Sequence, residues 1–182
     1  MRKVIFGGAN SLDNYFARKD HSVDWLMWSP EAGEIMKETW PRFDVMLMGR
    51  KTWDASVANF SEEDLEKARK NHSGMKTYVF SRTKPAGPIA DGIEMVNTDV
   101  VDLVRELKSQ EGKDIMLMGG GDLAKTLFEA GLIDEIGFNI HPVLLGSGIP
   151  LFHEMSRQID LELIEARPFK NGCVYVYYRV KN

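Results

Sequence analysis

Two runs of consecutive apolar residues mark the predicted centre of the fold. Residues 44–48 and 114–118 read DVMLM and DIMLM, and such continuous runs are typical of strands covered on both faces of a parallel sheet. Apolar residues instead alternate over 136–140 and 174–180, which predicts strands at a mixed or antiparallel edge. Further short strands are expected at 3–9, 77–80 and 93–96.

Helix signals separate these strands. The sequence SPE at residues 29–31 combines a serine N-cap with a proline and an acid in the first turn, and this helix is expected to end near Pro41. Apolar residues repeat at helical spacing over 99–109, and another helix should follow the glycines at 119–121. A charged helix is expected at 61–70, and loops are expected at 10–29 and 84–92.

The size and composition of the chain favour one globular domain over residues 1–182. It is 43% hydrophobic, and the alternation of strands and helices predicts a three-layer α/β domain. A net charge of −4 argues against a dedicated nucleic-acid-binding protein. No stretch approaches the roughly 20 apolar residues that span a membrane, and no secretory leader is recognisable, so a cytoplasmic protein is expected.

The chain offers little for a disulfide or a metal ion. Cys173 is the single cysteine, which excludes an intrachain disulfide. His141 and His153 have no second histidine or acid at ligand spacing. We therefore expect no metal site.

The two apolar strands end in the same way, at a glycine followed by a helix. Gly49 follows the first strand, and Gly119–Gly121 follows the second. Glycine lets the backbone approach a ligand closely, and the start of a helix presents unpaired N–H groups that favour phosphate. Tight turns alone could explain one such glycine. Two matched turns favour binding of both phosphates of a dinucleotide, or of one phosphate from each of two ligands.

Basic residues stand where a phosphorylated cofactor would need them. Arg50 and Lys51 follow the first glycine, and Ser81 and Arg82 follow the strand at 77–80. Arginine and hydroxyl side chains at strand ends suit an adenosine 2′-phosphate, so NADPH is favoured over NADH. For Arg82 alone, an ordinary basic surface loop is the alternative.

Several of these segments resemble a known family. Residues 49–53 (GRKTW) resemble the G-R-x-T-W/Y turn of the dihydrofolate reductase superfamily, Ser81-Arg82 resembles its adenosine-phosphate turn, and the glycine triplet resembles its pyrophosphate turn. Residues 11–17 (SLDNYFA) and 142–152 (PVLLGSGIPLF) are similar to segments in the reductase domain of bifunctional riboflavin-biosynthesis deaminase–reductases. Asn14 replaces a usual glycine of that segment, but asparagine tolerates the left-handed conformation better than most residues.

The resemblance implies a fold, a cofactor and an assembly. The expected fold is dihydrofolate-reductase-like, with a mostly parallel, twisted eight-stranded sheet, an antiparallel C-terminal edge and helices on both faces. A homodimer is also expected. The implied NADPH-binding residues, with Ala9 near the nicotinamide amide and Ala17 near the ring, are Ala9, Ala17, Gly49, Arg50, Lys51, Thr52, Ser81, Arg82, Gly119, Gly120, Gly121, Asp122 and Leu123.

The proton donor is less well defined than the cofactor site. A true folate reductase has one carboxylate on its first helix, and here that helix carries Glu31 and Glu34. Asp13 and Asp24 are alternatives from the preceding loop. We expect the catalytic acid among Asp13, Glu31 and Glu34, although an acid in a first helical turn also serves the helix dipole and Asp13 can equally fix its loop.

Trp25 and Trp28 are expected to line a flat pocket for a ring substrate, with core packing as the alternative. Together these features predict an NADPH-dependent reductase of a pyrimidine- or pterin-like heterocycle or of its attached sugar, similar to 5-amino-6-(5-phosphoribosylamino)uracil reductase. Three alternatives stay open: a non-catalytic NADP(H)-binding dimeric regulatory or sensor protein, a dihydrofolate reductase proper, and a general aldehyde or nitro-compound reductase.

Overall fold

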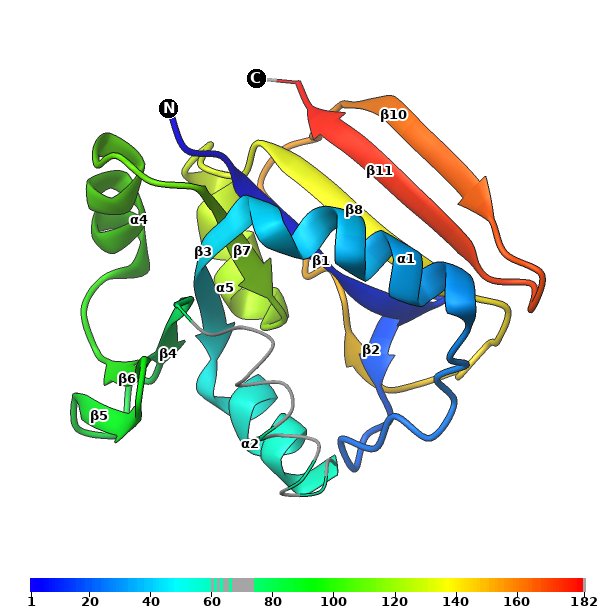
Figure 1. The fold of residues 1–182 in the computed structure, drawn as a ribbon, viewed down its shortest axis with the longest axis horizontal. Coiled ribbons are helices and arrows are strands. Elements are labelled where there is room, and N and C mark those ends of the chain that lie inside the picture. Colours follow the sequence, from blue (N-terminus) through cyan, green and yellow to red (C-terminus); the bar gives the residue numbers. More distant parts are fainter. Residues whose placement is uncertain (60, 62, 64–65, 67–73, 182) are drawn as a thin grey trace.

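A twisted nine-stranded sheet forms the centre of the computed structural model, which describes residues 1–59, 61, 63, 66 and 74–181 (Figure 1). The strand order is β10-β11-β8-β1-β7-β3-β4-β6-β5. The strands are β1 (Val4–Ser11), β3 (Phe43–Gly49), β4 (Lys76–Phe80), β5 (Gly87–Ala90), β6 (Ile93–Val96), β7 (Asp114–Met118), β8 (Glu135–His141), β10 (Leu161–Pro168) and β11 (Val174–Val180). A small second sheet pairs β2 (Tyr15–Ala17) with β9 (Ile149–Pro150).

The two apolar runs form neighbouring central strands. β3 and β7 are parallel, with Met46 opposite Met116 and Leu47 opposite Leu117. β8, β1, β4 and β6 extend this parallel arrangement, whereas β11 and β10 pair antiparallel at the C-terminal edge. The predicted mostly parallel sheet with an antiparallel C-terminal edge is confirmed.

One edge of the sheet differs from the expectation of eight strands. β5 lies within the segment 84–92 that the sequence analysis assigns to a loop, and it pairs antiparallel with β6. Asp91 and Gly92 join the two strands, and Gly92 has a φ of +69°, the left-handed conformation that a two-residue hairpin turn requires. The Asp-Gly pair between two short strands is the local signal for this ninth strand.

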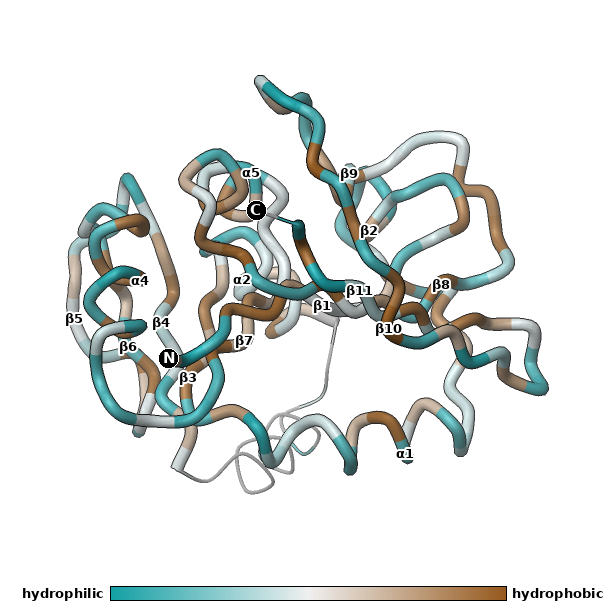
Figure 2. The backbone as a smooth tube through the Cα atoms, turned by 90° about the horizontal axis from the view of Figure 1, so that it is seen from above, coloured by the Kyte–Doolittle hydropathy of each residue, from teal (hydrophilic) through white to brown (hydrophobic). Residues whose placement is uncertain are grey.

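Helices cover both faces of the sheet (Figure 2). α1 (Pro30–Thr39) lies on one side, and α4 (Val100–Ser109) and α5 (Gly121–Glu129) pack on the other. Ser29 caps α1 by accepting a hydrogen bond from the N–H of Ala32 at 3.2 Å, so the predicted helix start is confirmed. α2 (Arg50–Asn59) follows β3 directly, and the 3-10 helix η1 (Trp40–Arg42) follows α1. The charged helix predicted at 61–70 lies largely outside the described residues.

Alternation along the strands divides the core into two. Val4 and Phe6 of β1 face α4 and α5, whereas Ile5 faces the side of α1. On that second side Ile35 of α1 packs with Ile5 and Tyr175. Within the part of the chain that the structure describes, no helix has the length and apolar character needed to cross a membrane.

The predicted loop at 10–29 begins with ordered strand structure. β1 continues to Ser11, and Asn14 turns the chain into β2 with a φ of +64°, so the asparagine adopts the left-handed conformation expected of it. Asp13 fixes the turn, because its carboxylate accepts hydrogen bonds from the Ser11 hydroxyl and from the N–H groups of Leu145 and Gly146.

Candidate functional site

The two glycine turns lie side by side at the carboxyl ends of β3 and β7. A Cβ built on Gly49 would stand 3.6 Å from the Cα of Gly120. Gly119 and Gly120 have φ values of +76° and +91°, and a Cβ on Gly119 would lie only 2.6 Å from Thr52 Cγ2. Gly119 therefore requires glycine both for its backbone conformation and for space, and Gly120 requires it for its backbone conformation.

The helix that follows the glycine triplet starts without a side-chain cap. Gly120 is the N-cap of α5, and as a glycine it provides no side-chain capping hydrogen bond. Uncapped N–H groups at a helix start favour an anion. His153 lies beside this turn, since a Cβ on Gly121 would stand 2.6 Å from its Nε2 atom. His153 was not among the residues predicted for the site.

The ends of β4 and β6 add polar residues at the same sheet edge. The Ser81 hydroxyl accepts hydrogen bonds from the N–H groups of Thr83 and Lys84, at 3.2 and 3.0 Å, so it shapes the turn that carries the exposed Arg82. Asn97 and Thr98 follow β6 next to this turn and also line the site. They were missed, although their position after a parallel strand could have indicated them.

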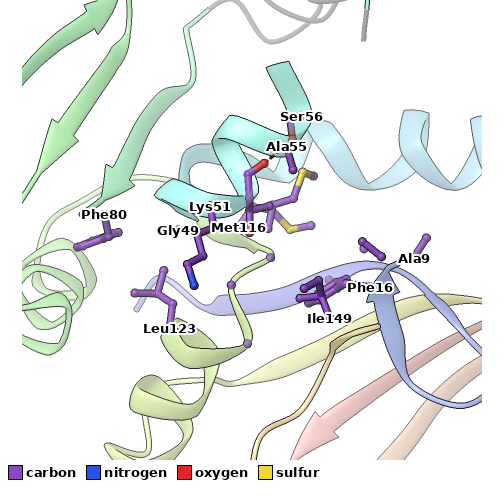
Figure 3. A pocket seen from close by; sticks show the side chains of 18 of the residues that line it. Ala9, Phe16, Gly49, Lys51, Ala55, Ser56, Phe80, Met116, Leu123 and Ile149 are labelled. Carbon is purple, nitrogen blue, oxygen red and sulfur yellow. Dashed lines mark hydrogen bonds between the residues drawn. The ribbon is translucent and has the colours of Figure 1, made fainter. Parts of the chain in front are cut away.

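A single cavity of about 1160 Å³ connects these elements. Every residue that the sequence analysis assigns to the cofactor lines it: Ala9, Ala17, Gly49, Arg50, Lys51, Thr52, Ser81, Arg82, Gly119, Gly120, Gly121, Asp122 and Leu123. Figure 3 shows Phe80 and Leu123 towards one end, Gly49 and Lys51 between, and Ala9, Phe16 and Ile149 towards the other. The structure thus brings the predicted set together, while its role in binding stays a prediction.

The cavity continues under α1. Its wall there includes Ile35 and Thr39 of α1, and its floor includes Gly7 of β1, Gly137 of β8 and Tyr175 of β11. This part is largely apolar and lies against the sheet face opposite to α4 and α5. It offers room for a flat ligand between helix and sheet.

The structure does not bring the three predicted catalytic acids to this cavity. Asp13 holds the turn described above, and hydrogen bonds, first that from Ser11, lower its pKa. The Glu31 carboxylate accepts the N–H of Lys170 at 3.3 Å, and Glu34 is also absent from the cavity wall. α1 is turned so that Ile35 faces the sheet, which leaves these acids outside the wall. The loop alternative, Asp24, pairs instead with Arg18 at 2.6 Å.

The two predicted ring-binding tryptophans have different positions. Trp28 lines the cavity and is 70% exposed. Trp25 is buried outside the described cavity wall, with its ring edge on His141 at a centroid distance of 5.2 Å. Core packing, the alternative given for these residues, accounts for Trp25.

A polar cluster centred on the buried Glu135, at the cavity floor, was missed by sequence reasoning. The Tyr177 hydroxyl donates a short hydrogen bond to Glu135, and Arg42 Nη1 lies 3.2 Å from the same hydroxyl. Lys3 Nζ lies 2.6 Å from the other Glu135 oxygen. These residues are far apart in sequence and meet only through strand pairing, so no local motif marks them.

Electrostatics give this group a defined charge state. Burial, followed by the hydrogen bond to Glu135, raises the pKa of Tyr177, so its phenol stays protonated. Burial alone would raise the pKa of Glu135, but hydrogen bonds from Lys3 and Tyr177 outweigh it and hold that pKa below its usual value. A carboxylate thus anchors Tyr177 from behind the floor of the cavity.

Known proteins are similar to this chain over nearly its whole length. "Uncharacterized protein YyaP" of Bacillus subtilis is 35% identical over 97% of this chain and 94% of its own length. The structure resembles a putative riboflavin biosynthesis protein from Shewanella sp. PV-4, with a TM-score of 0.82 and 26% identity over 100% of both chains. Dihydrofolate reductase from Enterococcus faecalis, complexed with NADP(H) and RAB-propyl, matches with a TM-score of 0.66 and 15% identity over 99% of this chain and 97% of its own.

A family model accounts for most of the sequence. The RibD C-terminal domain model matches residues 2–175, which include both glycine turns and the strands from β1 to β10. The sheet and its helices agree with the dihydrofolate-reductase-like fold of the solved structures. The chain therefore belongs to the RibD C-terminal domain family and has a dihydrofolate-reductase-like fold.

Proposed function

We propose that this protein is an NADPH-dependent reductase of a pyrimidine- or pterin-like heterocycle or of the sugar attached to it. The observation that carries the proposal is the single cavity that joins both glycine turns to the apolar space under α1. A dinucleotide along the turns and a flat substrate under the helix would meet in it. Bound NADPH would supply the hydride, and the chain would position both ligands and exclude water.

The cavity end at the glycine turns fits a dinucleotide phosphate. A side chain at Gly119 or Gly121 would collide with Thr52 or His153 and fill the cradle, and the start of α5 is uncapped. We assign the pyrophosphate to this turn. Arg50 and Lys51 add charge at the start of α2, although Arg50 also pairs with Asp54.

The adenosine and nicotinamide ends follow from that assignment. We assign the adenosine 2′-phosphate to Ser81 and Arg82, because an arginine beside a buried hydroxyl suits a phosphate monoester. Ala9 and Ala17 would flank the nicotinamide at the far end of the turns. Their small side chains leave room for a ring between β1 and β2.

The source of the proton differs from that in a folate reductase. Among the described residues of the cavity wall, the carboxylates are Asp99, which caps the start of α4, and Asp122, which follows the glycine triplet. The apolar part under α1 contains tyrosines instead. A tyrosine hydroxyl or water is therefore the proton source we expect, and a dihydrofolate reductase proper is disfavoured.

Cofactor titration followed by a substrate panel tests the proposal. NADPH should quench tryptophan fluorescence and raise the melting temperature, and it should then be oxidised by one of dihydrofolate, the ribosylaminopyrimidine phosphate of riboflavin synthesis or simple aldehydes. No response to NADPH would overturn the cofactor assignment. Binding without turnover of any compound would favour a non-catalytic NADP(H)-binding regulatory protein, and the described residues that line the cavity under α1, which include no carboxylate, also point to it. Turnover of aldehydes alone would favour a general reductase.

We also propose a homodimer in the cytoplasm, on the basis of the family resemblance. Apolar side chains exposed on the edge strand β10, Leu163 at 55% and Ile164 at 45%, are compatible with a protein partner there. Sedimentation velocity of the purified protein at micromolar concentration tests the dimer.

A further inference from the structure

On the sheet face under α1, two glycines lie next to each other on adjacent strands, and we call this pair the glycine column. Gly7 of β1 is opposite Gly137 of β8, and Gly137 is opposite Tyr177 of β11. A Cβ on Gly7 would lie 2.8 Å from the Gly137 carbonyl oxygen, and one on Gly137 would lie 2.7 Å from the Tyr177 ring. The two glycines thereby hollow the cavity floor and let the tyrosines of β11 lean over it.

Two stacked tyrosines border this hollow, and their hydroxyls differ. The rings of Tyr175 and Tyr177 are 6.2 Å apart and inclined by 18°. The Tyr177 hydroxyl is engaged by Glu135 and Arg42. The Tyr175 hydroxyl would stand 3.0 Å from a Cβ on Gly137, and the described residues give it no hydrogen-bond partner. An anchored phenol therefore supports a second one whose polar end is unused.

The Tyr175 hydroxyl can act as a hydrogen-bond donor. Its ring is buried, which raises the pKa of Tyr175 to about 12, so the phenol keeps its proton at neutral pH. An unused donor in an apolar cavity discriminates strongly in favour of ligands that offer an acceptor there.

Asn139 adds a second polar group next to Tyr175, which lies opposite it across β8 and β11. Its Nδ2 atom is 3.2 Å from His141 Nε2, and its Oδ1 atom is buried without a partner. Because His141 Nδ1 accepts the N–H of Met27, Nε2 of the neutral ring carries the proton. Two donors cannot bond each other, so the amide oxygen faces His141 and the NH₂ group takes the buried position without a partner. Asn139 itself lines the cavity.

We propose that the Tyr175 hydroxyl, with the Asn139 amide beside it, forms a polar edge that recognises a carbonyl oxygen of the heterocyclic substrate. This inference rests on the proposed function and makes Tyr175 a specificity-determining residue of the same cavity. The glycine column admits the edge of the ring, and the stacked Tyr177 fixes the angle of the donor.

The test compares two pyrimidines that differ at the recognised position. 5,6-Diaminouracil carries ring carbonyls, and 2,4,5,6-tetraaminopyrimidine carries amino groups in their place. Binding of each to the NADP⁺-saturated protein is measured by ligand-observed NMR. The wild type should prefer the uracil, and Tyr175→Phe should weaken its binding about tenfold while leaving the other probe unchanged, since one hydrogen bond is worth about 0.5–1.5 kcal/mol.

A matched variant separates this role from packing. Tyr178→Phe removes the same atom from the same strand, but Tyr178 faces the core under α4 and α5, so neither affinity should change. The inference is overturned if Tyr175→Phe keeps the wild-type preference, or if the wild type does not bind 5,6-diaminouracil. Titration of both variants with NADPH alone keeps the two proposals apart, because an intact NADPH response with lost discrimination concerns Tyr175 only.

Discussion

Arg82 tests the cofactor assignment at the scale of one residue. It is exposed at the mouth of the cavity, after the turn that Ser81 shapes, so its replacement should not disturb the fold. Arg82→Ala should weaken NADPH binding about tenfold, as loss of a hydrogen bond to a charged group implies, and should leave NADH nearly unchanged. Fluorescence titration with both cofactors measures this. Arg105→Ala, an exposed arginine on α4, is the control, and equal losses for NADPH and NADH would remove the 2′-phosphate from Arg82.

Single residues could be predicted where the chemistry is local. The glycine turns and Ser81-Arg82 carry their signal within a few positions, and the structure brings all of them to one cavity. Whether Glu31 and Glu34 face the cavity could not be predicted from the local sequence, because the rotation of α1 about its axis depends on how Ile35 packs against the sheet. The preference for acids in a first helical turn is independent of that rotation.

The turn between β7 and α5 makes a prediction at the scale of the element. Gly119→Ala would force a side chain into a left-handed position against Thr52, so it should destabilise the fold by about 1–3 kcal/mol and abolish the NADPH response. Gly33→Ala is the matched change inside α1, where a Cβ would meet nothing within 4 Å, and it should add about 0.5–1 kcal/mol. Urea unfolding measures both. If the Gly119→Ala protein is as stable as the wild type and responds equally to NADPH, the assignment of the pyrophosphate to this turn is wrong.

Elements were predictable in proportion to the strength of their pattern. The continuous apolar runs became β3 and β7, and the capped start of α1 lies where Ser29 predicts it. β5 was missed because Pro88 and the glycines around it resemble a loop, although Asp91-Gly92 is a typical hairpin turn. Weak strands are stabilised by their neighbours, and a single segment carries little of that information.

At the scale of the whole molecule, strand pairing assembles the cavity floor from residues that are distant in sequence. Lys3, Arg42, Glu135 and Tyr177 come from four separate elements or segments, and only the order of strands brings them together. Tyr175 reaches the glycine column for the same reason. The phosphate end of the site could therefore be predicted from local motifs, whereas the substrate end required the three-dimensional arrangement.

Glu135 links that assembly to the pH dependence of folding. Its pKa is lowered in the folded state from the usual 4.5, so its contribution is complete above that value and is lost as the pH falls through the lower folded pKa. Glu135→Gln should cost about 1–3 kcal/mol at pH 7, because Lys3 and Arg42 lose a buried charged partner. The difference in unfolding free energy from the wild type should shrink as both proteins are acidified below pH 4.5. Glu162→Gln, which alters an exposed pair with Arg179, should show a small difference at every pH. If the loss of unfolding free energy in Glu135→Gln stays constant down to the acid transition, the charge of the carboxylate is not what stabilises the floor.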